Sequence, residues 1–224
     1  MRPVPLLLGH RGARVSGIAE NTTDAFDFAL RHGCDGFEFD VRLAQDGAAV
    51  VCHNARSRGR TISRSSKQQL VYLHCLRDIL ARYSSRAFLD IELKVSGLEA
   101  PLLDALREHP PQNGYFVSSF SPKVLIELSR RDASVPLGFI CDKKKHLPLW
   151  RELPIEYVVP NYSLITTGLM HEIENAGKKV FAWTVNRKSL MGRLANWGVH
   201  GIISDSPERL VKTLSPANML TPRD

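Results

Sequence analysis

The feature that most constrains the fold of this 224-residue chain is a regular alternation of short apolar segments with longer amphipathic ones. The apolar segments are rich in valine, isoleucine and phenylalanine and are bounded by turn residues, which is typical of β-strands. The stretches between most of them show helical periodicity. The sequence predicts nine strands, at 5–10, 36–41, 49–53, 87–94, 115–120, 135–140, 157–161, 179–185 and 201–205. It predicts seven helices, at 20–32, 67–83, 98–108, 122–131, 167–176, 187–197 and 207–214.

The strand predicted at 49–53 does not fit the alternation, because only a short segment containing Asp46-Gly47 separates it from the strand before it. Asp-Gly between extended runs is a hairpin signal, and a parallel crossover needs about a dozen residues. This strand should therefore fold back antiparallel, which leaves eight strands alternating with helices. That pattern predicts one (β/α)₈ (TIM) barrel domain over residues 1–224, with an extra hairpin strand after the second barrel strand. A doubly wound open sheet is the alternative.

Active sites of such barrels lie at the carboxyl ends of the strands, and polar residues collect there in this sequence. The hairpin should also place His53 beside Asp40. The candidate site residues at these strand ends are His10, Arg11, Glu38, Asp40, His53, Glu92, Lys94, Trp183 and Asp205.

Three acids among them predict a metal site. Glu38 and Asp40 are two residues apart and point to the same side of a strand, and Glu92 follows on the next barrel strand. Converging carboxylates repel one another, and a hard divalent cation, Mg²⁺ or Ca²⁺, relieves that repulsion. The alternative is a salt-bridge network of these acids with Arg11 and Lys94.

The remaining rim residues are suited to phosphate chemistry. His10 and His53 could act as an acid and base pair at a phosphorus centre. Arg11 offers a guanidinium for phosphate and Lys94 a point charge. The net charge of +7 also favours anionic partners.

A basic segment at about 54–67, which carries Arg56, Arg58, Arg60, Arg64 and Lys67, follows the hairpin. It predicts a positive lip beside the site, suited to an anionic diester or to weak contact with an anionic membrane surface, or else a plain solvated loop. It has no interleaved aromatic residues, and we expect no nucleic-acid partner. No apolar run reaches the length of a membrane span, and the run at 4–8 is too short for a signal peptide, so we expect a cytoplasmic protein. The oligomeric state is left open.

Several motifs, taken in order, resemble those of the glycerophosphodiester phosphodiesterase family. They begin with Gly9-His10-Arg11-Gly12-Ala13, Glu20-Asn21-Thr22 and Gly36-Phe37-Glu38-Phe39-Asp40-Val41. They continue with Val50-Val51-Cys52-His53, Ile91-Glu92-Leu93-Lys94, Ala182-Trp183-Thr184-Val185-Asn186 and Gly201-Ile202-Ile203-Ser204-Asp205-Ser206-Pro207. The resemblance implies a TIM barrel that hydrolyses glycerophosphodiesters to an alcohol and sn-glycerol 3-phosphate with a divalent cation.

By position, the resemblance assigns His10 and His53 to the acid and base pair and Glu38, Asp40 and Glu92 to the metal. It assigns phosphate binding to Arg11 and Lys94, a place near the metal to Glu20, and a place in the pocket wall to Trp183. Without the resemblance, Glu20 equally fits a residue in the first turn of a helix. Trp183 equally fits a buried aromatic side chain at the barrel rim.

Two departures from the family pattern keep other functions open. Asn54 stands where the family usually has an aspartate after the second histidine, and the segment after His53 is shorter than the usual cap. The alternatives are a lysophospholipase-D-like enzyme acting on lipid diesters, and a catalytically silent barrel that binds phosphodiesters or lipid headgroups.

Overall fold

Eight parallel strands form a closed barrel in the computed structural model, which describes residues 4–215. The ends of the domain predicted at 1–224 therefore lie outside the described residues. The strands are β1 (Leu6–Gly9), β2 (Gly36–Leu43), β6 (Phe88–Leu93), β7 (Tyr115–Ser119), β8 (Leu137–Cys141), β9 (Tyr157–Pro160), β10 (Lys179–Ala182) and β11 (Gly201–Ser204). β1 pairs in parallel with both β2 and β11, and this closure confirms the barrel over the open sheet.

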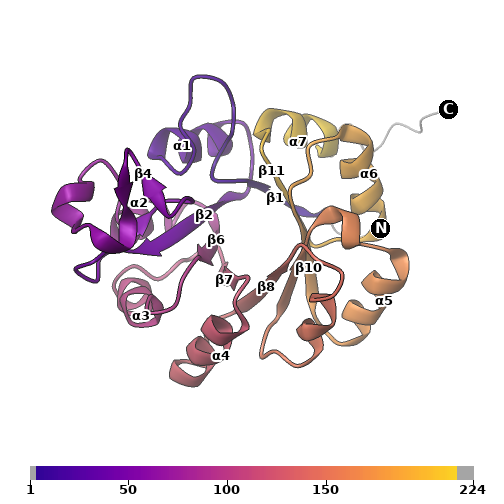
Figure 1. Ribbon diagram of the computed structural model, residues 1–224. Coiled ribbons are helices and arrows are strands. Elements are labelled where there is room, and N and C mark those ends of the chain that lie inside the picture. The colour runs from indigo at the N-terminus through magenta and orange to yellow at the C-terminus, as the bar shows by residue number, and fades with distance from the viewer. Residues whose placement is uncertain (1–3, 216–224) are drawn as a thin grey trace.

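The helices lie around the outside of the strands, as Figure 1 shows. They are α1 (Thr23–Arg31), α2 (Leu76–Tyr83), α3 (Glu99–Glu108), α4 (Pro122–Arg131), α5 (Thr167–Asn175), α6 (Lys188–Trp197) and α7 (Pro207–Leu214). Between β8 and β9 the chain forms a 3₁₀ turn, η3 (Leu147–Arg151), which buries Trp150. No helix of the described chain is both long and apolar enough to cross a bilayer.

The predicted hairpin is present. β3 (Ala49–Val51) pairs antiparallel with β2, with Val41 opposite Val51. The basic segment that follows contains a small hairpin, β4 (Arg56–Ser57) and β5 (Arg60–Thr61), and two 3₁₀ turns, η1 (Ile62–Arg64) and η2 (Lys67–Leu70). We call residues 54–70 the cap segment; its hairpin lies on the left of Figure 1, where β4 is labelled.

The helix predicted at 67–83 is wrong over its first half. Ser66 forms a capping box with Gln69, but the turn ends at Leu70, and α2 begins only at Leu76. Between them, Cys75 forms an antiparallel bridge with Val50 of the hairpin. Residues 71–73 form a turn and a bend instead of a helix, and Cys75 is extended, so tertiary contact with the hairpin overrides the helical periodicity.

The core has two main layers, and a smaller apolar cluster joins the β2–β3 hairpin to the cap segment. One lies between the strands and the helices and includes Phe26 of α1 stacked on Phe37 of β2 with ring centroids 4.1 Å apart. The other fills the barrel and consists of Leu8, Phe88, Phe116, Ile140, Tyr157, Val159, Phe181 and Ile203. At β2 the alternation is Phe37, Glu38, Phe39, Asp40, with both phenylalanines in the outer layer. The two acids therefore point inward, above the apolar filling, where the site forms.

Candidate active site

An inner cavity of about 90 Å³ lies at the carboxyl ends of the barrel strands. Its floor is apolar, from Ile140, Val159 and Ile203, and its other walls carry the polar residues predicted at the rim. Those other lining residues are His10, Arg11, Glu38, His53, Asp90, Glu92, Lys94, Phe120 and Trp183. Every residue predicted to be catalytic or substrate-binding therefore lines one cavity.

The three predicted metal ligands converge. Glu38, Asp40 and Glu92 are buried and offer oxygen atoms that all lie within 4.8 Å of one another. In the register of the sheet, Asp40 of β2 lies directly opposite Glu92 of β6. Two cations contact the cluster: Lys94 Nζ lies 2.6 Å from Glu92 Oε1 and 3.2 Å from Asp40 Oδ1, and Arg11 Nε lies 3.3 Å from Asp40 Oδ2.

The cluster strongly perturbs the titration of its members. Burial, together with the charges of Asp40 and Glu92, raises the pKa of Glu38 well above its usual value. Burial and the charge of Asp40 raise the pKa of Glu92 to about 7. Burial also favours the neutral form of Asp40, but Lys94, Arg11 and a hydrogen bond from Asn21 outweigh it and lower the pKa of Asp40. The same acids raise the pKa of Lys94 despite its burial.

These residues fit a divalent cation. Glu38 Oε1 is buried without a hydrogen-bond partner, while Glu38 Oε2 accepts from the backbone N–H of Arg11 at 2.8 Å. When all three carboxylates are ionised they face only two cationic side chains, and a bound cation would balance the excess negative charge. Hard cations take oxygen ligands at about 2.0–2.6 Å, and oxygens this close together can share one ion. The salt-bridge network named as the alternative is also present, through Lys94 and Arg11.

The backbone around His10 and Arg11 is fixed by two glycines. A Cβ on Gly9 would lie 1.8 Å from the carbonyl oxygen of Gly12, and one on Gly12 would lie 2.5 Å from the backbone of Ala25. Between them Arg11 adopts a left-handed φ of 52°. This uncommon conformation points its N–H at Glu38, which explains the Gly-His-Arg-Gly spacing in physical terms.

His10 is held by an acid that the sequence analysis placed on the rim without a role. His10 Nδ1 lies 2.7 Å from Asp205 Oδ1, and His10 Nε2 lies 3.8 Å from Glu38 Oε2. Asp205 in turn accepts a hydrogen bond from Asn186 Nδ2 at 2.7 Å. Asp205 therefore holds the imidazole so that Nε2 faces the carboxylates.

The hairpin places His53 near Asp40, as predicted, because the N–H of the neighbouring Cys52 donates to the Asp40 carbonyl at 2.9 Å. His53 Nδ1 lies 3.0 Å from Asn54 Oδ1, so the Asn54 amide occupies the position that would orient the imidazole, without adding a charge. Burial lowers the pKa of His53, against the opposing effect of Asp40.

Aromatic side chains close one side of the cavity. Trp183 donates from Nε1 to the Val159 carbonyl at 2.9 Å, and its ring meets Phe120 edge to face at 5.5 Å between centroids. Lys94 Nζ lies 5.6 Å from the centre of the Phe120 ring. Phe120 ends a strand predicted from the sequence, but nothing in its residue type marked it as part of the site.

Glu20 lies outside the carboxylate cluster. It contacts Arg11 Nη1 at 2.7 Å and Arg14 Nε at 2.8 Å, so its charge is matched by two arginines. Its neighbour Asn21, which was not predicted as a site residue, donates to Asp40 Oδ2 at 2.7 Å. Asp90, also missed, lies two residues before Glu92 on the same face of β6 and accepts from Ser118 Oγ at 2.5 Å. Its period-two spacing from Glu92 was the signal that could have found it.

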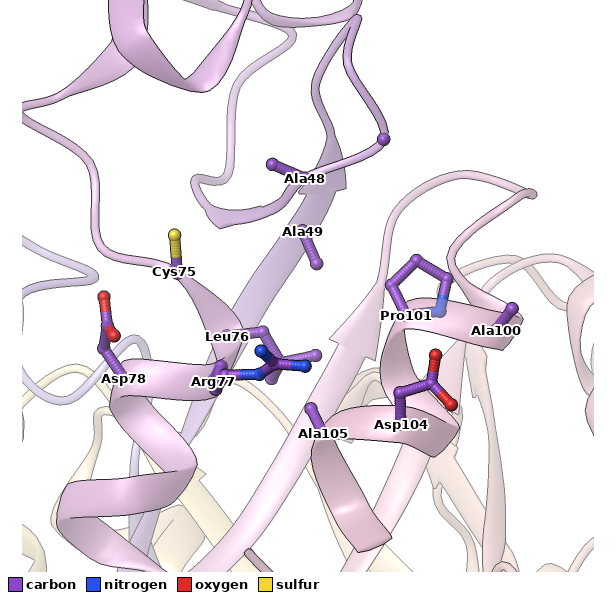
Figure 2. A pocket seen from close by; sticks show the side chains of 11 residues that line it. Ala48, Ala49, Cys75, Leu76, Arg77, Asp78, Ala100, Pro101, Asp104 and Ala105 are labelled. Atoms are coloured by element: carbon purple, nitrogen blue, oxygen red, sulfur yellow. The ribbon is translucent and has the colours of Figure 1, made fainter. Parts of the chain in front are cut away.

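A larger hollow lies elsewhere and contains none of the residues predicted for the site. It measures about 550 Å³ and lies between the β2–β3 hairpin, the start of α2 and α3. Figure 2 shows its alanine and proline walls, with Arg77 reaching across from α2. It shares no lining residue with the inner cavity, so the volume of a cavity does not by itself identify the candidate active site.

The fold and the site together define a class: a (β/α)₈ barrel whose rim joins two histidines to a carboxylate cluster and fixed cations. Comparison with known proteins agrees with this class. The model of the Glycerophosphoryl diester phosphodiesterase family matches residues 10–74 and 90–209. The chain belongs to this family and is one of its phosphodiesterases.

Individual relatives are similar along nearly their whole length. The glycerophosphodiester phosphodiesterase of Caldanaerobacter subterraneus subsp. tengcongensis is 29% identical over 234 residues, which cover 92% of this chain and 96% of that protein. The crystal structure of a putative glycerophosphoryl diester phosphodiesterase from Silicibacter pomeroyi DSS-3 superposes with a TM-score of 0.85 at 23% identity, covering 96% of this chain and 94% of that one. An Oleispira antarctica phosphodiesterase, solved with the product sn-glycerol-3-phosphate, gives a TM-score of 0.80 at 24% identity, covering 94% and 96%. Both structural likenesses bear on the fold alone.

Proposed function

We propose that this chain, as a single domain, hydrolyses water-soluble glycerophosphodiesters to an alcohol and sn-glycerol 3-phosphate in a reaction that depends on a divalent cation. The observation that carries the proposal is the convergence of His10, His53, Glu38, Glu92 and Lys94 on one small cavity. The product bound to the Oleispira relative is consistent with this substrate class.

His10 and His53 form the acid and base pair of the proposed reaction. One imidazole accepts the proton of the attacking hydroxyl, which comes from water or from the neighbouring glycerol hydroxyl. The bond between phosphorus and the alcohol oxygen then breaks, and the other imidazole gives its proton to the departing alkoxide. If the glycerol hydroxyl attacks, a cyclic phosphate forms and water opens it with the two histidines in reversed roles.

The other rim residues bind and orient the substrate. Glu38, Asp40 and Glu92 would hold the cation, Mg²⁺ or Ca²⁺, which when bound supplies Lewis-acid polarisation of the phosphate oxygens. Lys94 and Arg11 supply fixed positive charge to the phosphate. Trp183 and Phe120 form an apolar wall on the glycerol side.

The size of the inner cavity favours soluble diesters over lipid ones. At about 90 Å³, bounded by Trp183 and by the floor of Ile140, Val159 and Ile203, it matches a small polar glycerol better than an acyl chain. Contact of the basic cap segment with an anionic membrane surface, and a cytoplasmic location, stay predictions from the sequence.

The test is release of sn-glycerol 3-phosphate from glycerophosphoethanolamine and glycerophosphocholine, after EDTA treatment and then with Mg²⁺, Ca²⁺ or Mn²⁺ restored. We expect product only when metal is restored. His10→Ala and His53→Ala should each lower kcat by about 10²–10⁴-fold. Loss of less than tenfold in both variants would refute the histidine assignment, and no product with any cation would refute the proposed substrate.

A further inference from the structure

A second, outer cavity has a volume of about 240 Å³. It shares one lining residue, His53, with the inner cavity. The outer cavity is bounded on one side by the residues that precede α1, among them Asn21, and on the other by Asn54, Arg56 and Arg58 of the cap segment and by Tyr72. A diester whose phosphorus lies beside His53 thus has two compartments next to it.

The wall on the cap side carries two arginines, Arg56 and Arg58, and the second is held by its turn and by Tyr72. Arg58 and Gly59 form the two-residue loop between β4 and β5, and both adopt positive φ, of 47° and 77°. Such a turn prefers asparagine or glycine at both positions, so arginine at 58 is conformationally disfavoured there. The guanidinium of Arg58 lies 4.3 Å from the centre of the Tyr72 ring, and the Tyr72 hydroxyl donates to the Ser57 carbonyl at 3.0 Å.

These arginines carry unmatched charge. Within residues 4–215, neither Arg56 nor Arg58 has a carboxylate within ion-pair distance; Arg56 Nη2 contacts only the Gly59 carbonyl, at 3.4 Å. The acid that lines the same cavity, Glu20, is already matched by Arg11 and Arg14. The outer cavity is therefore positively charged at its cap-side wall.

From this geometry we infer that the outer cavity is the subsite for the alcohol portion of the diester, and that Arg56 and Arg58 select alcohols that bear an anionic group, a carboxylate or a phosphate. The inference rests on the proposed function and adds a substrate preference to it. The glycerol phosphate lies in the inner cavity, the phosphorus lies beside His53, and the anionic group meets the two guanidinium groups, which suit carboxylate and phosphate geometry.

A matched pair of substrates tests the inference. Glycerophosphoserine and glycerophosphoethanolamine differ by one carboxylate on the alcohol, and the measured quantity is the ratio of their kcat/KM values. We expect the wild type to prefer the serine diester. Arg56→Gln and Arg58→Asn should each lower the ratio about threefold, and the double variant about tenfold, in keeping with the modest strength of solvent-exposed ion pairs. Asparagine suits the positive φ at 58, so that variant keeps the turn.

Arg60→Gln is the control, because it removes the same charge from the same hairpin at a residue that does not line the cavity. It should leave the ratio unchanged, and the thermal unfolding of every variant checks that the cap segment is folded. Replacing the serine diester with glycerophosphorylglycerol phosphate tests whether the two arginines also select a phosphate group on the alcohol.

If both diesters are hydrolysed and none of the cap-segment variants changes the ratio of their kcat/KM values, the subsite inference is overturned. The proposed function then still stands. A wild type that prefers the ethanolamine diester also overturns the subsite inference alone. Turnover of neither diester with any cation overturns the proposed function, and the subsite inference with it.

Discussion

His10, the first histidine of the proposed acid and base pair, follows β1, and Asp205 follows β11 at the other end of the sequence; His10 Nδ1 and Asp205 Oδ1 lie 2.7 Å apart across 195 residues. The contact exists because β1 and β11 are neighbours in the closed barrel. A carboxylate in this position fixes the tautomer and orientation of an imidazole and stabilises its protonated form. Asp205 touches no substrate in the proposed reaction and acts as a positioning residue.

We therefore predict that Asp205→Asn lowers kcat by about 10²–10⁴-fold with a much smaller change in KM. The substitution disturbs the tautomer of the His10 imidazole and removes no contact with the substrate. Steady-state kinetics on glycerophosphoethanolamine measures both constants. Asp205→Glu should recover part of the activity. A change confined to KM would contradict the positioning role.

Asn54→Asp should move the pH dependence of the reaction. Asn54 Oδ1 faces His53 Nδ1 at 3.0 Å, and burial already lowers the pKa of His53. A negative charge at this place favours the protonated imidazole and raises that pKa. The limb of the pH profile of kcat/KM that reports His53 should shift to higher pH, whether His53 acts as acid or as base.

The control for this change is Asn161→Asp, which adds the same charge at an amide that does not contact either histidine but accepts from Ser163 N–H at 3.0 Å. Its profile should match that of the wild type. An Asn54→Asp profile that coincides with the wild type would show that His53 does not titrate in catalysis.

Metal binding should be detectable without turnover. A ligand that binds only the folded state raises its stability, so Ca²⁺ or Mg²⁺ should raise the Tm of EDTA-treated protein. Glu38→Gln should abolish most of that rise, because it neutralises a carboxylate of the buried cluster. Asp104→Asn, which removes an exposed acid paired with Arg107, should leave the rise intact. Equal metal-dependent shifts in all three proteins would place the ion elsewhere.

His200 should make the fold sensitive to mild acid. The backbone N–H of Val180 donates to His200 Nδ1 at 3.2 Å, and burial and the nearby Lys179 lower the pKa of His200 below 6.5. The unfolded chain thus takes up a proton at this residue before the folded chain does. Its contribution to stability is present above pH 6.5 and is lost as the pH falls from there through the lower pKa of the folded state.

Thermal unfolding at pH 7 and pH 5 measures this contribution. His200→Asn keeps an oxygen that can accept from Val180 but removes the titration, so its Tm should fall less between the two pH values than that of the wild type. Equal falls would show that His200 does not contribute to the acid sensitivity.

Much of this molecule could be predicted from the sequence because the relevant signals are local. The alternation of strands and helices specified the barrel, and Asp46-Gly47 specified the hairpin that brings His53 back to β2. Along β2 the period of two placed Phe37 and Phe39 in the outer layer, so Glu38 and Asp40 point inward. Where the prediction was wrong, at 67–83, a distant bridge between Cys75 and Val50 decided the backbone.

The residue types at the strand ends were determined by the sequence, but which of them touch was decided by closure of the barrel. Closure pairs His10 with Asp205, whereas Glu20 meets Arg11 and Arg14 within its own loop, outside the carboxylate cluster. The hairpin and the cap segment add an outer cavity beside His53, which the residue spacing alone did not predict. The physical reason is range: strand periodicity and turn chemistry act over a few residues, whereas contacts between elements distant in sequence form only when the whole sheet closes.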